Sequence, residues 1–418
     1  MAKQGGGDIE WATCLAPPAA STYPCASSPV RLVAWAPGGP SSPPSYIYSN
    51  ASHVRPVVAC KLRAISSKDV LTILGTDDLD LAFSQLHGKG REDPGDHRVR
   101  RLDGGCRQQR LHPHHSQGQL PPYGRDFDGS IATGRFSNGR LTTDFLSVAL
   151  GLPSSVPAYL DGSYTIDQLA TGVCFASAAT GLDALTAKLS SVIPLSQQLE
   201  YFKEYKGRLK LAKGEAVADK IIADALYVFS IGTNDFMLNY FVVPLRAAEY
   251  TPEEYATDLV SLAEAAVRDV HELGARKVMF SGIPPFGCVP VMRTVNHDAP
   301  GECNEEYNRV ALRYNAEIQD AIGRLDSELG AGSQVVYTDV YDVPYHIIAN
   351  PSGYGFENAA QGCCRTGLYE TSVLCGVDEA FTCQDADKYV FFDSVHPSEK
   401  TYRILADKIV RSTLQVFL

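Results

Sequence analysis

Residues 225–235 read ALYVFSIGTND, and this stretch indicates the fold class. Its apolar run ends in glycine, which is typical of a strand that is buried on both faces. A helical pattern follows at 252–273, with two glutamates in its first turn and Gly274 as a stop signal. Strands that alternate with helices of this length indicate βαβ units around a parallel sheet covered on both faces.

The same alternation continues to the C-terminus. The sequence predicts strands and helices in the order strand, helix, strand, strand, helix at 276–282, 307–329, 334–341, 389–392 and 397–416. We therefore expect residues 120–418 to form one α/β domain.

Ligands of such domains bind at the carboxyl ends of the strands, where two polar clusters lie. In GTND (232–235), the amide of Asn234 is suited to stabilising an oxyanion, although these residue types are also common in turns. In DSVHP (393–397), Asp393 lies three residues before His396 and can orient its imidazole as a general base. The alternative is an N-cap aspartate beside a surface histidine.

Taken together, GxND followed by DxxHP resembles the plant-type GDSL esterase/lipases of the SGNH hydrolase superfamily. The resemblance covers residues 120–418, and many segments occur in the order of that family. These segments are PPYGRDF (121–127), TGRFSNGRLTTDFL (133–146), GVCFASAATGLD (172–183), FSIGTNDF (229–236), GIPPFGCVP (282–290), CNEEYN (303–308), GCCRTG (362–367) and FFDSVHPSE (391–399).

This resemblance implies a three-layer α/β/α sandwich of the flavodoxin-like type and hydrolysis of acyl esters through a Ser–His–Asp triad. By analogy, His396 is the catalytic base and Asp393 is the acid that orients it. Asn234, Gly232 and the backbone amide of Ala179 would form the oxyanion hole. The family has glycine at the position of Ala179, and alanine tolerates fewer backbone angles than glycine does.

The Gly-Asp-Ser block that carries the nucleophile of this family is absent from the chain. Where the block is expected, residues 92–119 read EDPGDHRVRRLDGGCRQQRLHPHHSQGQ and show almost no apolar spacing. Read one base later, compatible codons turn this segment into KIPAIIVFGDSTVDAGNNAFIPTIAKGN, with serine at the position of Leu102. We infer that residues 92–119 are a frameshifted remnant of the nucleophile block, or that the gene model is incorrect.

No nucleophile is therefore identifiable in the chain as written. Ser137 and Ser230 are interpreted as ordinary loop and strand residues. We also expect the first strand of the sheet to be missing or disrupted, because an arginine-rich segment cannot be buried in its place. The sequence thus predicts a poorly folding chain without measurable esterase activity.

Residues 1–91 show no catalytic pattern and are rich in Pro, Ser, Ala and Gly up to about Asn50. We expect this extension to be irregular or disordered. The cluster of His112, His114 and His115 raises the alternative of a metal-dependent hydrolase. Because the segment does not clearly supply acidic ligands, we predict no metal site there, and no cofactor is expected.

The bulk composition excludes two classes of partner. The net charge of −11 and the pI of about 5.4 argue against binding to nucleic acid or to an anionic membrane. No run of apolar residues is long enough for a transmembrane segment. We expect a monomer that acts on a small-molecule or lipid ester.

The cysteines predict an oxidising environment. Six of the 11 cysteines lie in loop-like sequence of the C-terminal part without zinc-type spacing, and we predict a disulfide framework. Together with the family resemblance this indicates an extracellular protein, whereas the first twenty residues show no signal peptide. The alternative functions are a non-catalytic pseudoenzyme or binding protein that keeps the fold, or the product of an incorrect gene model.

Overall fold

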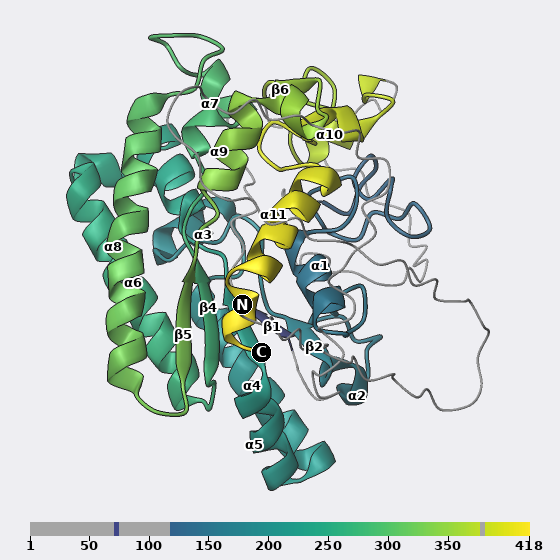
Figure 1. Cartoon of the computed structure of the whole chain (residues 1–418), viewed down its shortest axis with the longest axis vertical. Coiled ribbons are helices and arrows are strands. Elements are labelled where there is room, and N and C mark those ends of the chain that lie inside the picture. The colour runs from purple at the N-terminus through teal and green to yellow at the C-terminus, as the bar shows by residue number, and fades with distance from the viewer. Residues whose placement is uncertain (1–70, 75–117, 377–380) are drawn as a thin grey trace, which may run out of the picture. The chain divides into compact units, whose positions relative to one another are not determined.

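The computed structural model describes residues 71–74, 118–376 and 381–418, all of which belong to the unit Val57–Leu418. Its centre is a five-stranded parallel sheet in the order β2-β1-β3-β4-β5 (Figure 1). The strands are β1 Leu71–Leu74, β2 Gly172–Cys174, β3 Leu226–Phe229, β4 Lys277–Ser281 and β5 Gln334–Thr338. A second sheet pairs β6 Asn358–Gly362 with β7 Tyr389–Phe391, so the strand predicted at 389–392 lies outside the central sheet.

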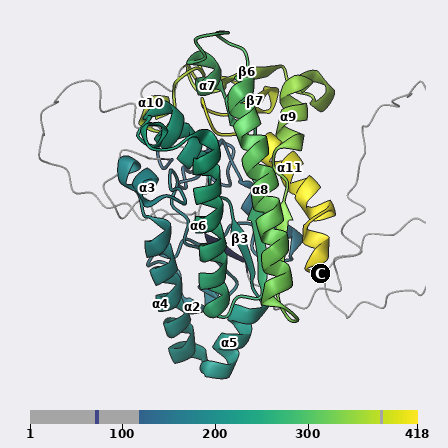
Figure 2. The same cartoon turned by 90° about the vertical axis from the view of Figure 1, so that its left-hand side faces the viewer.

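Helices cover both faces of the central sheet, as the sequence predicted (Figures 1 and 2). The α-helices are α1 Thr142–Ala149, α2 Ile166–Leu169, α3 Ala184–Ser190, α4 Leu195–Lys213, α5 Glu215–Asp224, α6 Pro252–Glu272, α7 Pro290–Thr294, α8 Glu305–Leu329, α9 Asp342–Ala349, α10 Val373–Gly376 and α11 Glu399–Arg411. The prediction at 252–273 is confirmed by α6, whose start is fixed by Pro252 and by a capping box between Thr251 and Glu254.

The strands build two cores because successive side chains of a strand point to opposite faces. In β3, Tyr227 and Phe229 join the large core formed with α4, α6 and α8. Leu226 and Val228 of the same strand join the smaller core formed with α1 and α11. These three layers confirm the predicted α/β/α sandwich.

The sheet differs from the prediction at its first strand. We expected that strand to be missing or disrupted, but β1 lies between β2 and β3, with Leu71 paired to both Gly172 and Leu226. Leu71 is fully buried, so an apolar stretch from within residues 1–91 supplies the strand between β2 and β3. The remainder of that predicted irregular extension lies outside the described residues.

The predicted disulfide framework is confirmed for the six C-terminal cysteines. They form the pairs Cys288–Cys303, Cys363–Cys383 and Cys364–Cys375. Within the described ranges, no helix combines the length and the apolarity needed to cross a membrane.

Candidate active site

The structure brings Asp393 and His396 into direct contact in the loop between β7 and α11. The Nδ1 atom of His396 lies 2.6 Å from Oδ2 of Asp393, and both side chains are buried. The second carboxylate oxygen accepts the backbone N–H groups of Val395 and His396 at 2.8 and 2.6 Å. A proton on Nδ1 in this hydrogen bond leaves Nε2 as the basic nitrogen of the neutral ring.

This geometry excludes the alternative of a surface histidine beside an N-cap aspartate. His396 is 2% exposed, and the N-cap residue of α11 is Ser398.

Two further hydroxyl groups hold the carboxylate of Asp393. Tyr123 donates to Oδ2 at 2.7 Å and Thr371 donates to the same oxygen at 3.2 Å. The hydroxyl oxygen of Tyr123 also accepts the backbone N–H of Ser372 at 2.8 Å, which fixes its position. The carboxylate is thus surrounded by donors, and both of its buried oxygen atoms have hydrogen-bond partners.

The segment FSN (136–138) holds the other side of the same loop. The ring of Phe136 is stacked on the imidazole of His396, with the centroids 4.7 Å apart. The Ser137 hydroxyl donates to the backbone oxygen of Pro397 at 3.2 Å, and Asn138 Oδ1 accepts the N–H of Glu399 at 2.8 Å. Ser137 is therefore a buried structural residue, in agreement with its interpretation as an ordinary loop residue.

The GTND cluster begins a helix rather than a turn. Gly232 follows β3 with φ of +130°, and a Cβ at this position would lie 3.2 Å from Ile283 and from Tyr314. The chain then enters a π-helix, Asp235–Val242. Asn234 is fully buried at the start of this helix and donates from Nδ2 to the backbone oxygen of Thr180 at 2.8 Å. An amide nitrogen carries two protons, so one remains for a ligand.

Ala179 occupies a backbone conformation that favours glycine. Its φ is +64°, in the left-handed region that costs an L-residue roughly 1–2 kcal/mol. The bond from Asn234 to Thr180, the next residue, places these two predicted oxyanion-hole elements side by side. The alanine therefore adopts this conformation at some energetic cost.

A buried carboxylate fixes the segment after Ala179. Asp235 accepts hydrogen bonds from the N–H groups of Leu182 and Asp183 at 2.8 and 3.1 Å and from the Thr186 hydroxyl at 2.6 Å. Burial raises the pKa of Asp235 to about 7, although these donors oppose the shift. Because Asp235 adjoins Asn234 in sequence, it ties the two halves of the predicted oxyanion hole together.

An apolar cavity of about 180 Å³ adjoins the His–Asp pair. His396 and Thr233, the residue before Asn234, both line it. Ser230 lines it as well, at the end of β3, while Ala179 and Asn234 are not among its lining residues. An imidazole at the edge of an apolar cavity is suited to reactions of a substrate that carries an aliphatic group.

Comparison with known proteins identifies the family. The model of the GDSL-like Lipase/Acylhydrolase family matches residues 104–409. The chain belongs to this family. A GDSL esterase/lipase of Arabidopsis thaliana is 48% identical over 296 residues, which cover 71% of this chain and 84% of the relative. A second GDSL esterase/lipase of Arabidopsis thaliana is 45% identical over 302 residues, covering 72% and 86%. By family, this GDSL protein is a carboxylic ester hydrolase.

Two predicted features of this GDSL chain lie outside the described residues. They are the position of the expected nucleophile, near Leu102, and the cluster of His112, His114 and His115. The family match begins at residue 104, after the position of Leu102.

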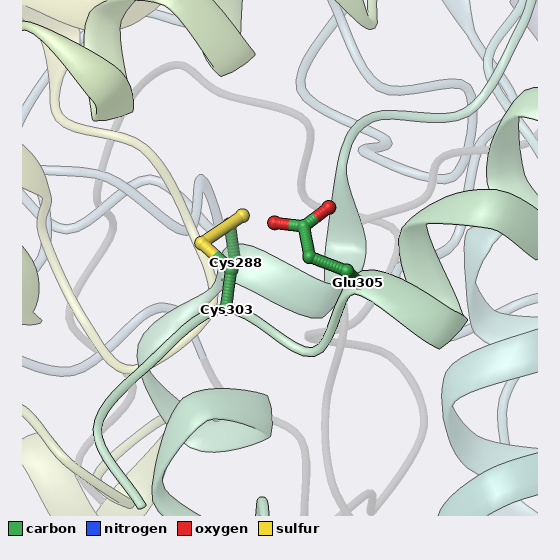
Figure 3. Close-up of side chains that lie close together, drawn as sticks. All are labelled: Cys288, Cys303 and Glu305. Atoms are coloured by element: carbon green, nitrogen blue, oxygen red, sulfur yellow. A yellow bond between two sulfur atoms is a disulfide. The ribbon is translucent and has the colours of Figure 1, made fainter. Parts of the chain in front are cut away.

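One group of side chains in the described ranges has the spacing of metal ligands, but its chemistry does not suit a metal. Cys288, Cys303 and Glu305 have their ligand atoms within 4.8 Å of one another (Figure 3). The two sulfur atoms are joined in a disulfide, and the metal ligand would be a thiolate. The group is therefore a disulfide at the start of α8.

Sequence reasoning did not identify Tyr123, Thr371 and Phe136 as contacts of the His–Asp pair. Tyr123 lies in PPYGRDF and Phe136 in TGRFSNGR, two segments that supported the family resemblance. Neither segment carries a local chemical pattern that points to a residue more than 250 positions away. The family motifs were the available signal, and Thr371 had none.

Proposed function

We propose that His396 and Asp393 are the base and the orienting acid of a Ser–His–Asp esterase site whose serine is missing from the chain as written. The supporting observation is the buried hydrogen bond of 2.6 Å between Nδ1 of His396 and Asp393 at the edge of an apolar cavity. Asn234, Gly232 and the backbone amide of Ala179 complete the site as its oxyanion hole.

The sequence after β1 supports the loss of the nucleophile. The family's serine follows the first strand, in Gly-Asp-Ser, and its expected position in this sequence is Leu102. The strand that lies between β2 and β3 is β1, and it is not followed by Gly-Asp-Ser either. Here β1 ends at Leu74, the chain continues as Gly75-Thr76-Asp77-Asp78, and the next serine is Ser84. Loss of a triad member typically lowers kcat by a factor on the order of 10⁶, so we propose that hydrolysis by this chain is impaired.

A second candidate function is that of a non-catalytic binding protein. The observation in its favour is that the cavity and the His–Asp pair persist without an identifiable serine. Such a protein would bind acyl compounds but would not react with an active-site serine probe.

The test compares two full-length proteins. One is the chain as written, and the other has residues 92–119 replaced by KIPAIIVFGDSTVDAGNNAFIPTIAKGN. We expect the restored chain to hydrolyse p-nitrophenyl acetate and to react with a fluorophosphonate probe, and the chain as written to do neither. His396→Ala in the restored chain is the control, and it should abolish hydrolysis.

Each result tests a different part of the proposal: the assignment of the triad, the impairment of this chain, or the correctness of the gene model. An inactive restored chain that folds would refute the assignment of the triad. Hydrolysis by the chain as written would refute its impairment, and mapping of the labelled peptide would identify the serine, with Ser230 the candidate that shares the cavity with His396. A transcript whose frame is unbroken across codons 90–122 and encodes the present residues would refute an incorrect gene model.

We also propose that the protein acts outside the cell. Three disulfides among the described residues require an oxidising environment to form and persist. Fractionation of the native tissue tests this proposal, since a pool of cytosolic protein with alkylatable cysteines would contradict it.

A further inference from the structure

The cavity beside His396 lies between the central sheet and the helices of one face. Its sheet wall includes Val228 of β3 and Met279 of β4, and its helix wall includes Leu146 of α1 and Ile409 of α11. These four side chains belong to the smaller core. The walls are therefore those of an apolar core that has been left open beside a reactive imidazole.

The carboxyl ends of two strands place hydroxyl groups in this apolar cavity. Ser281 ends β4 and Thr338 ends β5, and the two residues are paired in register. Adjacent strands of a sheet lie about 4.8 Å apart, so the two side chains are neighbours. Both residues line the cavity. Ser281 lies two positions after Met279, so the two side chains point to the same face of the sheet.

These two hydroxyl groups are buried. Ser281 is 7% exposed and Thr338 is 1% exposed, and neither Oγ of Ser281 nor Oγ1 of Thr338 has a hydrogen-bond partner in the described part of the chain. A buried polar atom that lacks a partner destabilises a protein, because the hydrogen bonds it made to water in the unfolded chain are not replaced. Two such atoms side by side in one cavity point to a ligand that supplies an oxygen atom.

We propose that the cavity binds an aliphatic acyl chain that carries a hydroxyl group, with that hydroxyl bound by Ser281 and Thr338. This inference rests on the proposed function, which places the ester carbonyl of the same ligand beside His396. An unsubstituted chain would fill the apolar walls but leave both hydroxyl groups unpaired. A hydroxylated chain pairs them, since a hydroxyl group both donates and accepts hydrogen bonds.

The direct test measures binding to the full chain as written, so that hydrolysis does not consume the ligand. Isothermal titration compares decanoate with monohydroxydecanoates that differ in the position of the hydroxyl group. We expect at least one isomer to bind about tenfold more tightly than decanoate. If every isomer binds as weakly as decanoate or more weakly, the hydroxyl groups serve only to hold water, and the inference is overturned.

Variants then assign the preference to the two residues. Ser281→Ala with Thr338→Val should remove the tenfold preference while decanoate still binds. The matched control is Thr72→Val, because Thr72 is a buried strand threonine without a hydrogen-bond partner in the described ranges. Its register partner Tyr227 belongs to the other core, so it points away from the cavity. A double variant that keeps the preference would refute the assignment, and if that variant does not fold, the comparison of isomers still decides.

The experiments distinguish failure of the hydroxyacyl inference from failure of the proposed triad. If the restored chain hydrolyses esters but no hydroxylated isomer is preferred, only the hydroxyacyl inference is wrong. If a hydroxylated isomer is preferred but the restored chain is inactive, the cavity binds as inferred and the proposed triad is wrong.

Discussion

The hydroxyl of Tyr123 and Oδ2 of Asp393 lie 2.7 Å apart, although 270 positions separate the two residues in the sequence. The same oxygen contacts Nδ1 of His396. Tyr123 therefore contacts the carboxylate that contacts the imidazole, so in the proposed triad it is a positioning residue. Because Tyr123 does not line the cavity, this role is separate from substrate binding.

Tyr123→Phe should lower the free energy of unfolding by about 2 kcal/mol, because it removes a buried hydrogen bond to a charged group. In the restored chain the variant should lower kcat and leave KM unchanged. Urea unfolding and steady-state kinetics measure the two effects. The control is Tyr389→Phe, a half-buried tyrosine that we expect to change stability by less than about 0.5 kcal/mol. A raised KM with unchanged kcat would contradict the positioning role.

Asp235 should make stability depend on pH. Its unfolded pKa is near 3.8 and its folded pKa is about 7, because burial disfavours the ionised form. Between these values the unfolded chain has released the proton that the folded chain retains, so stability falls as the pH rises. This contribution is fully present below about pH 4 and is lost above about pH 7.

The comparison with Asp235→Asn isolates this effect, since all other groups titrate in both proteins. The stability of the wild type relative to the variant should decrease by up to about 1.4 kcal/mol per pH unit across that window. Urea unfolding at a series of pH values measures it. A difference that stays constant from pH 4 to pH 7 would show that Asp235 is ionised throughout.

Gly232→Ala should be strongly destabilising. The residue has φ of +130°, and a Cβ would lie 3.2 Å from both Ile283 and Tyr314. Backbone strain of this kind typically costs about 1–3 kcal/mol, and the crowding adds to it. Gly162→Ala is the matched control, because a Cβ there meets nothing within 4 Å. Thermal unfolding compares the two, and equal effects would refute the conformational requirement at Gly232.

Removal of the Cys288–Cys303 disulfide by paired alanine substitutions should lower the free energy of unfolding by roughly 3 kcal/mol, the value typical of a loop of this length. The bond spans 15 positions and joins the start of α8 to the segment before Val289, which lines the cavity. We therefore expect weaker binding of decanoate as well. Unchanged binding would show that the cavity wall holds without the disulfide.

The sequence predicted a parallel sheet covered by helices on both faces because apolar periodicity is a local property. The run at 225–232 has the period of a buried strand, and 252–273 has the period of an amphipathic helix. The sequence did not predict β1, because its four residues, LTIL, are too few to distinguish a strand from the irregular extension around them. Its place between β2 and β3 depends on pairing with strands that are more than 100 and 150 positions away.

For the candidate site, too, some features were predictable from the sequence and others depended on the tertiary structure. The contact between Asp393 and His396 was predictable, because three residues of spacing at a loop allow a local hydrogen bond. The lack of an identifiable serine was also a property of the sequence alone. Tertiary structure alone decided that Tyr123, Thr371 and Phe136 enclose this pair. It also decided that Ser281 and Thr338 face one cavity without hydrogen-bond partners in the described part of the chain. Contacts between distant segments depend on how the layers pack, and no local pattern in the sequence encodes them.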